Sequence, residues 1–278
     1  MKPLAKRVIL TLTAVPALFS LIYFLPYYNH LGFVVLVVLA IGVGSYEMRN
    51  LLFTESEPLV AYFLVPLLPL VHYFELRYYL KVELAEFLFI AFVLIAFFKE
   101  IFWGIKDNYE KSLKRIARSV FLLIYPGFLS IFLVKILFFK EATLLLLFLF
   151  LLVFGNDTFA YIFGMSLGSN NRNIFKVSPN KSLAGFIGGI ASTMAISFAY
   201  VYFIRPMREM IGLPYSLVIG FVIAIVSNVG DLIESVFKRG ANVKDSGTII
   251  MGRGGILDSI DSLLASAPIY VLMILIIG

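Results

Sequence analysis

Stretches of about 20 mostly apolar residues recur along the chain, with short polar or charged segments between them. A helix of about 20 apolar residues spans the hydrocarbon core of a bilayer. The pattern therefore predicts an all-α, polytopic transmembrane protein with about nine spans, at 8–26, 31–48, 58–75, 84–104, 117–139, 142–164, 183–204, 214–236 and 260–278. Pro66 and Pro69 interrupt the third span, which predicts a kinked or re-entrant segment there.

Composition narrows the chemistry that is available. Of the 278 residues, 61% are hydrophobic and 14% are charged, whereas a soluble domain is about half apolar and about a quarter charged. There is no cysteine, so disulfides and thiolate metal sites are excluded. The two histidines, His30 and His72, both lie in the N-terminal half. Chemistry further along must therefore use carboxylates, hydroxyls, lysines and arginines.

The basic residues lie between the apolar segments, so the net charge of +6 indicates membrane topology and not a nucleic-acid partner. With nine spans and a cytosolic N-terminus, 17 of the 23 Lys and Arg residues fall on the cytosolic side and 6 on the other. This predicts a multi-pass protein of the cell inner membrane. The segment Lys106 to Arg118 is predicted to lie along the cytosolic surface, or else to be a basic loop that only sets topology.

Polar residues are rare inside the predicted spans before Ala142 and common after it. We therefore expect an N-terminal transmembrane scaffold over 1–141 and a C-terminal catalytic region over 142–278. Charged side chains within a span are costly, and they are candidates for function. The cytosolic ends of three predicted spans carry acidic or amide side chains, namely Asn156, Asp157, Asn228, Asp231, Glu234, Asp258 and Asp261.

The spacing of these residues favours a cation site. Asn228, Asp231 and Ser235 follow one another at i, i+3 and i+7, which places them on one face of a helix. Carboxylates brought close together repel one another unless a cation or a proton lies between them. Hard oxygen ligands without cysteine or histidine suit Mg²⁺ and suit zinc poorly.

Basic residues and glycines share the cytosolic side with these carboxylates. The basic set is Lys176, Lys181, Lys238, Arg239, Lys244 and Arg253. Gly252, Gly254 and Gly255 form a turn before a helix start, where backbone N–H groups can approach a phosphate. Acidic metal ligands, basic side chains and a glycine-rich turn together indicate a site for nucleotide phosphates.

Each feature also has a simpler interpretation. Asp258 fits the N-cap of the last helix. Glu234 fits an i, i+4 surface salt bridge with Lys238. The basic residues fit a purely topological role, and the glycines fit an ordinary turn. Glu209 lies beside Arg205 and fits a solvated loop charge. Asp157 and Asp231 are harder to explain in this way, because each lies inside an apolar run.

The residues from about 150 to 278 also resemble a known family signature. Its parts here are Asn156-Asp157-Thr158, Ser178-Pro179-Asn180-Lys181-Ser182, Gly230-Asp231-Leu232-Ile233-Glu234-Ser235, Lys238-Arg239, Lys244-Asp245-Ser246-Gly247 and Gly252-Arg253-Gly254-Gly255-Ile256-Leu257-Asp258-Ser259-Ile260-Asp261. This order is similar to the phosphatidate cytidylyltransferase family, also called CDP-diacylglycerol synthase. The N-terminal half agrees with the family only in being hydrophobic.

The resemblance implies that phosphatidate attacks CTP, giving CDP-diacylglycerol and pyrophosphate for phospholipid synthesis. It implies Mg²⁺, with a second cation (K⁺ or another Mg²⁺), and Asp231 and Asp258 as the metal ligands. The implied catalytic set is Asp231, Asp258, Asp261, Asp245, Lys244 and Asp157. The implied substrate-binding set is Lys181, Ser178, Ser182, Lys238, Arg239, Arg253, Gly254, Gly255, Asn156 and Asn228. The expected partners are CTP, phosphatidate, the lipid bilayer and a second copy in a homodimer.

The chain departs from the family pattern at Met251, Arg253 and Ser259, where proline, histidine and arginine are usual. One hypothesis is that Arg253 supplies the guanidinium that position 259 lacks. Two other functions stay open at this point. A CTP-dependent kinase of polyprenol-type lipid alcohols would release CDP. A cation-coupled transporter would bind near the midplane, between inverted repeats, but the sequence shows no such repeat.

Overall fold

The computed structural model describes residues 3–53, 62–250 and 254–277, with side chains from Thr13 onward. Over these residues every regular element is a helix, and seven helices are long and apolar enough to cross a membrane. The prediction of an all-α, polytopic transmembrane protein is thereby confirmed. The count of nine spans and the cytosolic N-terminus stay predictions.

The chain forms two compact units. The first contains Met1–Phe138 and Asp245–Ser259, and the second contains Phe139–Lys244 and Ile260–Gly278. The boundary after Phe138 lies close to the predicted division at Ala142. The segment Asp245–Ser259 groups with the N-terminal part, although the family signature runs through it. The functional division into scaffold and catalytic region stays a prediction.

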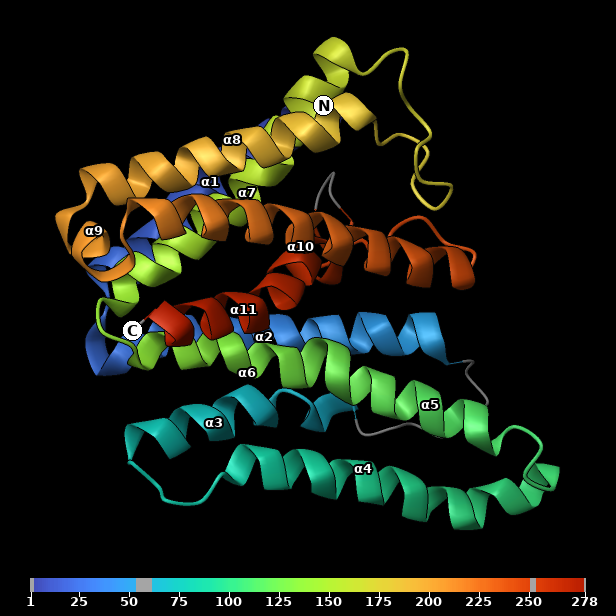
Figure 1. Ribbon diagram of the computed structural model, residues 1–278. Helices are drawn as coiled ribbons and strands as arrows, with labels where there is room; N and C mark the ends of the chain where they lie inside the picture. Colours follow the sequence, from blue (N-terminus) through green and yellow to red (C-terminus); the bar gives the residue numbers. More distant parts are fainter. Residues whose placement is uncertain (1–2, 54–61, 251–253, 278) are drawn as a thin grey trace. The chain divides into compact units, whose positions relative to one another are not determined.

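The first unit is built from α-helices with short turns of other helical types between some of them (Figure 1). Its helices are α1 (Pro3–Phe24), α2 (Tyr27–Leu52), α3 (Leu67–Arg77), α4 (Leu84–Trp103), α5 (Ser112–Leu122) and α6 (Leu129–Lys135), with the shorter turns η1 (Tyr62–Leu64), η2 (Gly104–Asp107), η3 (Leu123–Phe128) and η4 (Ile136–Phe138). The helical run α5–η4 passes through a π-helical turn that contains Pro126, and it is long enough to span.

The third predicted span is interrupted in the structure. Pro66 is the N-cap of α3, so the regular helix begins only at Leu67 and has 11 residues. In Figure 1, α3 runs opposite to α2 and α4, so the chain returns to the end of the unit where α2 begins. A break at this proline agrees with the expected kink, because proline lacks the N–H that a continuous helix requires.

The charged stretch from Lys106 to Arg118 connects α4 to α5, and its place along the membrane surface stays a prediction. It covers part of η2, a turn and the start of α5. Arg115 is buried, and its guanidinium donates to Glu100 and to Asp107, the latter at 2.5 Å. This buried ion pair fixes the turn between α4 and α5. Lys106, Lys111 and Lys114 are exposed around it.

The second unit contains α7 (Ala142–Leu167), α8 (Leu183–Phe203), α9 (Arg205–Ile211), α10 (Leu213–Gly240) and most of α11 (Leu257–Ile277). Helix α8 packs against both α7 and α10. Gly185 and Gly189 line its contact with α7, where an added Cβ would lie 2.6 Å from the Ala160 carbonyl oxygen or 2.9 Å from Asn156 Oδ1. Small residues of this kind let helix backbones approach closely within a membrane.

Candidate active site

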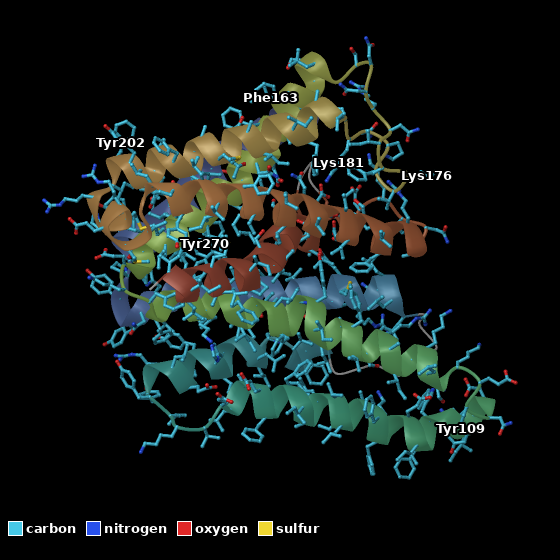
Figure 2. The ribbon with its side chains drawn as sticks, viewed as in Figure 1. Tyr109, Phe163, Lys176, Lys181, Tyr202 and Tyr270 are labelled. Atoms are coloured by element: carbon cyan, nitrogen blue, oxygen red, sulfur yellow. The ribbon has the colours of Figure 1, made fainter. Side chains whose placement is uncertain are left out.

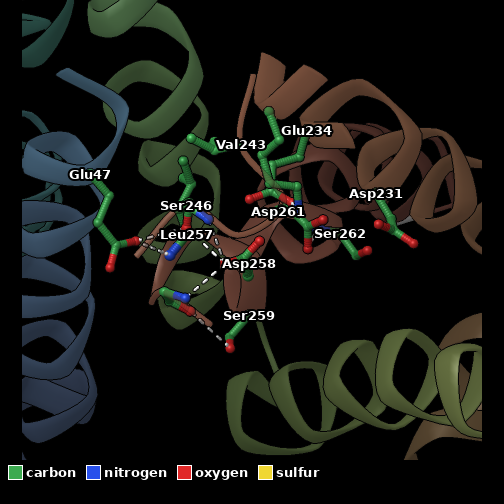
Figure 3. A network of polar contacts seen from close by, with 12 residues as sticks. Glu47, Asp231, Glu234, Val243, Ser246, Leu257, Asp258, Ser259, Asp261 and Ser262 are labelled. Atoms are coloured by element: carbon green, nitrogen blue, oxygen red, sulfur yellow. Dashed lines mark hydrogen bonds and ion pairs between the residues drawn. The ribbon is translucent and has the colours of Figure 1, made fainter. Parts of the chain in front are cut away.

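Three carboxylates from two helices meet in the second unit (Figure 3). Asp231 and Glu234 are one turn apart on α10, and Asp261 lies in the first turns of α11. One oxygen from each carboxylate lies within 4.8 Å of the other two. Glu234 and Asp261 are buried, whereas the Asp231 side chain is 38% exposed. This carboxylate cluster therefore extends from the interior toward solvent at Asp231.

Close packing of α10 and α11 brings the cluster together. A Cβ on Gly230 would lie 2.7 Å from the Cβ of Ala265, so only glycine fits at this crossing. The hydroxyl of Ser262 donates to the Ser227 carbonyl at 3.1 Å, which fixes the register of the two helices. Asp157 of α7 is close enough for its charge to act on Asp261. The predicted meeting of acidic residues at one end of several helices holds for Asp157, Asp231 and Asp261 within this unit.

Two lysines form ion pairs with carboxylates of the cluster. Lys181 Nζ lies 2.6 Å from Asp231 Oδ2, and Lys238 Nζ lies 2.5 Å from Glu234 Oε2. The predicted pairing of Glu234 with Lys238 is confirmed. Its expected location on the surface is wrong, because the Glu234 side chain is only 1% exposed. Glu234 lies on the buried side of α10, so this i, i+4 pair lies in the protein interior instead of in water.

The cluster has the donor set that a hard cation requires. Three carboxylates face two ammonium groups, so with all three ionised the cluster would carry excess negative charge even before Asp157 is counted. A buried charge without compensation is strongly unfavourable. One oxygen from each carboxylate lies within 4.8 Å of the other two, and carboxylate oxygens are ligands that Mg²⁺ prefers. The residues present therefore fit a magnesium ion held by Asp231, Glu234 and Asp261.

Glu234 is a ligand candidate that the sequence argument assigned to a salt bridge. Its i, i+3 spacing from Asp231 could have identified it, because this spacing places both carboxylates on one face of α10. The resemblance instead paired Asp231 with Asp258. Asp258 belongs to the other unit, and its role as a metal ligand stays a prediction.

The two predicted asparagines connect three helices. Asn156 Oδ1 of α7 accepts from Thr193 Oγ1 of α8 and from Asn228 Nδ2 of α10, each at 3.4 Å. Asn156 is fully buried, and within the described part of the chain its Nδ2 has no hydrogen-bond partner. These contacts suit the asparagines to hold the helices in register. Their contact with substrate stays a prediction.

The turn before α8 positions Lys181. Ser182 is the N-cap of α8, and its Oγ accepts from the Gly185 N–H at 3.1 Å. The carbonyl of Ser178 accepts from the Lys181 N–H at 3.1 Å. Arg239 lies at the end of α10, and its Nε donates to the Val177 carbonyl at 3.3 Å. Two predicted substrate-binding serines thus shape the turn that carries the predicted phosphate-binding lysine. Lys244 is exposed after α10.

In the first unit, Asp258 closes the glycine loop (Figure 3). Its Oδ2 accepts from the Ser246 N–H and Oγ at 2.9 Å each, and from the Gly255 N–H at 2.7 Å. Gly254 has φ +111°, a conformation that favours glycine. Asp245 is exposed, and the Ser259 hydroxyl faces the Gly255 carbonyl at 3.5 Å. Gly252 and Arg253 lie outside the described residues, so the compensation hypothesis stays a prediction.

Sequence reasoning missed Glu47 of α2. This side chain is buried, and its carboxylate accepts from Ser246 Oγ at 3.1 Å, from the Ile256 N–H at 3.0 Å and from the Leu257 N–H at 2.8 Å. A signal was available, because Glu47 is a lone carboxylate in the apolar run 31–48, the criterion that selected Asp157 and Asp231. The assumption that residues 1–141 serve only as a scaffold excluded it.

The fold and the carboxylate cluster define a class of protein, a polytopic helical membrane protein with an acidic and basic site suited to phosphates and a hard cation. Comparison with known proteins identifies its family. Residues 5–277 match the profile of the cytidylyltransferase family, so the chain belongs to that family. The match includes the N-terminal half, which the resemblance had left out.

Individual relatives match over part of their length. The chain is 40% identical over 131 residues to the phosphatidate cytidylyltransferase of Haemophilus influenzae, covering 45% of this chain and 44% of the relative. It is 38% identical over 131 residues to the phosphatidate cytidylyltransferase of Staphylococcus aureus, covering 47% and 48%. It is 37% identical to the uncharacterized protein YnbB of Escherichia coli, covering 47% and 42%. The aligned region thus spans a little under half of each relative.

Proposed function

We propose that this protein transfers the cytidylyl group of CTP to phosphatidate, giving CDP-diacylglycerol and pyrophosphate. The observation that carries the proposal is the carboxylate cluster with its two lysines, found in a member of the cytidylyltransferase family. Relatives named phosphatidate cytidylyltransferase support the choice of lipid substrate.

The reaction needs charge neutralisation more than it needs a base. An ionised phosphate oxygen of phosphatidate forms a bond to the α-phosphorus of CTP. The bond from that phosphorus to the oxygen of the β-phosphate breaks, and the electron pair leaves with pyrophosphate. The attacking oxygen carries no proton to remove, so the site must supply in-line positioning and stabilise developing negative charge.

The residues divide between cation and phosphates. Asp231, Glu234 and Asp261 would hold Mg²⁺, which when bound would neutralise charge on the CTP phosphates. Lys181 and Lys238 each bind one carboxylate of the cluster in the structure. With those carboxylates held to a cation, the two ammonium groups would be available to bind phosphate oxygens. The resemblance adds Asp258 and a second cation, with Asp157, Asp245, Lys244 and Arg239 in supporting roles.

We also propose that the site faces the cytosol from the inner membrane. CTP is a cytosolic nucleotide, and phosphatidate lies in the bilayer, so a site at one end of the spans meets both. The excess of basic residues on the predicted cytosolic side supports this orientation. Association into a homodimer is part of the proposal, and cross-linking in native membranes would test it.

The direct test uses the purified full-length chain with phosphatidate, Mg²⁺ and CTP labelled at the α-phosphate. We expect labelled CDP-lipid and pyrophosphate in equal amounts, with activity lost on chelation and restored by Mg²⁺. Asp231→Asn should lower kcat/KM by at least about 100-fold, because it removes charge at the reacting phosphates. Glu209→Gln is the matched control, since Glu209 forms an exposed pair with Arg205 on α9.

The products discriminate between the functions that the sequence left open. Release of CDP with a phosphorylated lipid alcohol would replace the proposal with a kinase. Cation-driven solute uptake into vesicles without CTP would replace it with a transporter. An Asp231→Asn variant as active as Glu209→Gln would remove the carboxylate cluster from the chemistry.

A further inference from the structure

We propose that Glu47 of α2 is a positioning residue for the loop that joins α10 to α11. This inference rests on the proposed function, because it assigns Glu47 a part in ordering the loop that carries Asp258. Glu47 touches no residue of the carboxylate cluster in the described contacts, and it would act through the loop and not on substrate. It would make α2, far away in sequence, part of the catalytic machinery.

Glu47 forms hydrogen bonds with residues near both ends of the loop (Figure 3). At one end its Oε2 lies 3.1 Å from Ser246 Oγ. At the other end its two oxygens accept from the backbone N–H groups of Ile256 and Leu257, at 3.0 and 2.8 Å. Ile256 directly precedes α11 and Leu257 is its first residue, so these N–H groups have no acceptor within the helix. A carboxylate is also favoured there by the helix dipole.

The loop backbone fits closely around this carboxylate. A Cβ on Gly247 or on Gly255 would collide with the Glu47 carboxylate, so a larger residue at either position would displace this side chain from its present place. Between these glycines, Ile250 and Gly254 pair through two backbone hydrogen bonds of 2.8 and 3.1 Å. The two sides of the loop are therefore joined by this backbone pair, and Glu47 connects Ser246 on one side to Ile256 and Leu257 on the other. This close fit on both sides indicates that the loop has a specific binding position for the Glu47 carboxylate.

Glu47 and Asp258 share one donor and take their other donors from adjacent residues. The Ser246 hydroxyl lies 3.1 Å from Glu47 Oε2 and 2.9 Å from Asp258 Oδ2, yet it has a single proton to donate. The Gly255 N–H donates to Asp258, and the next two N–H groups donate to Glu47. Loss of Glu47 would leave the Ile256 and Leu257 N–H groups, which belong to the two residues directly before Asp258, without their acceptor. The position of Asp258 therefore depends on Glu47.

The test compares Glu47→Gln with Glu75→Gln in the full-length protein. Glu75 is a matched control, because it is also a buried glutamate of the first unit that accepts from a backbone N–H in the first turn of a helix, Ala85 of α4 at 3.1 Å. Two readouts are needed, namely kcat and KM per folded molecule, and hydrogen exchange of the amides in 245–258. Ser246→Ala is a second variant, since it removes only the bridging hydroxyl.

We expect Glu47→Gln to lower kcat/KM for CTP by about 10- to 100-fold, because small misplacements of a catalytic group have effects of that size. KM for phosphatidate should stay within about twofold, and exchange in 245–258 should accelerate. Glu75→Gln should leave both readouts near wild type. Ser246→Ala should lower kcat/KM about fivefold, as loss of one hydrogen bond of about 1 kcal/mol implies.

The two proposals fail separately. If the wild type forms no CDP-lipid, the proposed function fails, and exchange in 245–258 still decides whether Glu47 orders the loop. If the wild type is active and Asp231→Asn is not, yet Glu47→Gln matches Glu75→Gln in turnover and in exchange, the inference about Glu47 is overturned and the proposed function stands.

Discussion

Glu234 and Glu209 show how burial changes the meaning of the same local pattern. Each is in an i, i+4 ion pair, Glu234 with Lys238 and Glu209 with Arg205. The side chains of the second pair are 81% and 64% exposed, whereas Glu234 is 1% exposed. An exposed pair contributes little to stability, but removal of one partner from a buried pair leaves a charge without compensation.

Lys238→Met should therefore destabilise the fold by about 3–5 kcal/mol, because it leaves the buried Glu234 carboxylate without its ammonium partner. Unfolding in detergent without Mg²⁺ measures the loss. Arg205→Met is the matched control, with an expected change under about 1 kcal/mol. The double variant Glu234→Gln with Lys238→Met should lose less than Lys238→Met alone. Simple additivity of the single losses would contradict this assignment.

At the scale of elements, the site depends on how closely α7, α8 and α10 approach. Gly185 and Gly189 form a G-x-x-x-G pattern on α8 that faces α7. Gly189 lies directly against Asn156, whose side chain connects α7 to Thr193 and Asn228. The glycines thus set the distance at which the polar residues of neighbouring helices meet.

Gly189→Ala should cost about 1–3 kcal/mol of stability, since the added Cβ would lie 2.9 Å from Asn156 Oδ1 and 3.0 Å from Ala160 Cβ. The melting temperature and the CTP turnover per folded molecule measure the effect, and we expect both values to fall. Gly240→Ala serves as the control, because a Cβ there has nothing within 4 Å. Equal behaviour of the two variants would show that close approach of α8 to α7 does not position the site.

At the scale of the whole molecule, function requires the site to face the compartment that holds CTP. Within the second unit, Lys176 and Lys181 lie toward one end, and Tyr202 lies toward the other (Figure 2). Helix α9, with Arg208, follows directly after the end that carries Tyr202. The carboxylate cluster shares the end of Lys181, to which Asp231 is bound.

The chain has no cysteine, so single cysteines can be introduced without a background. Lys176→Cys should react with a membrane-impermeant maleimide only in inverted membrane vesicles, and Arg208→Cys should react only in intact cells. The cysteine-free chain is the control for non-specific labelling. The reverse pattern would place the carboxylate cluster outside and separate it from cytosolic CTP.

The sequence alone determined the helical membrane architecture, because the length and apolar character of a span are local properties that burial in lipid enforces on each segment separately. It also selected Asp157 and Asp231 as candidates for function, since a carboxylate in an apolar run can be recognised without knowing its partner. It did not fix the third span, where the regular helix begins only after Pro66 and has 11 residues.

Only the tertiary structure decided which charged residues act together. It grouped Glu234 with Asp231 and Asp261, and it buried the pair with Lys238 that spacing alone left on the surface. It also brought Glu47 of α2 to Ser246 and Leu257, about 200 positions away along the chain. Such contacts depend on close helix packing at glycines and on backbone N–H groups, and local spacing does not tell which distant residues these bring together.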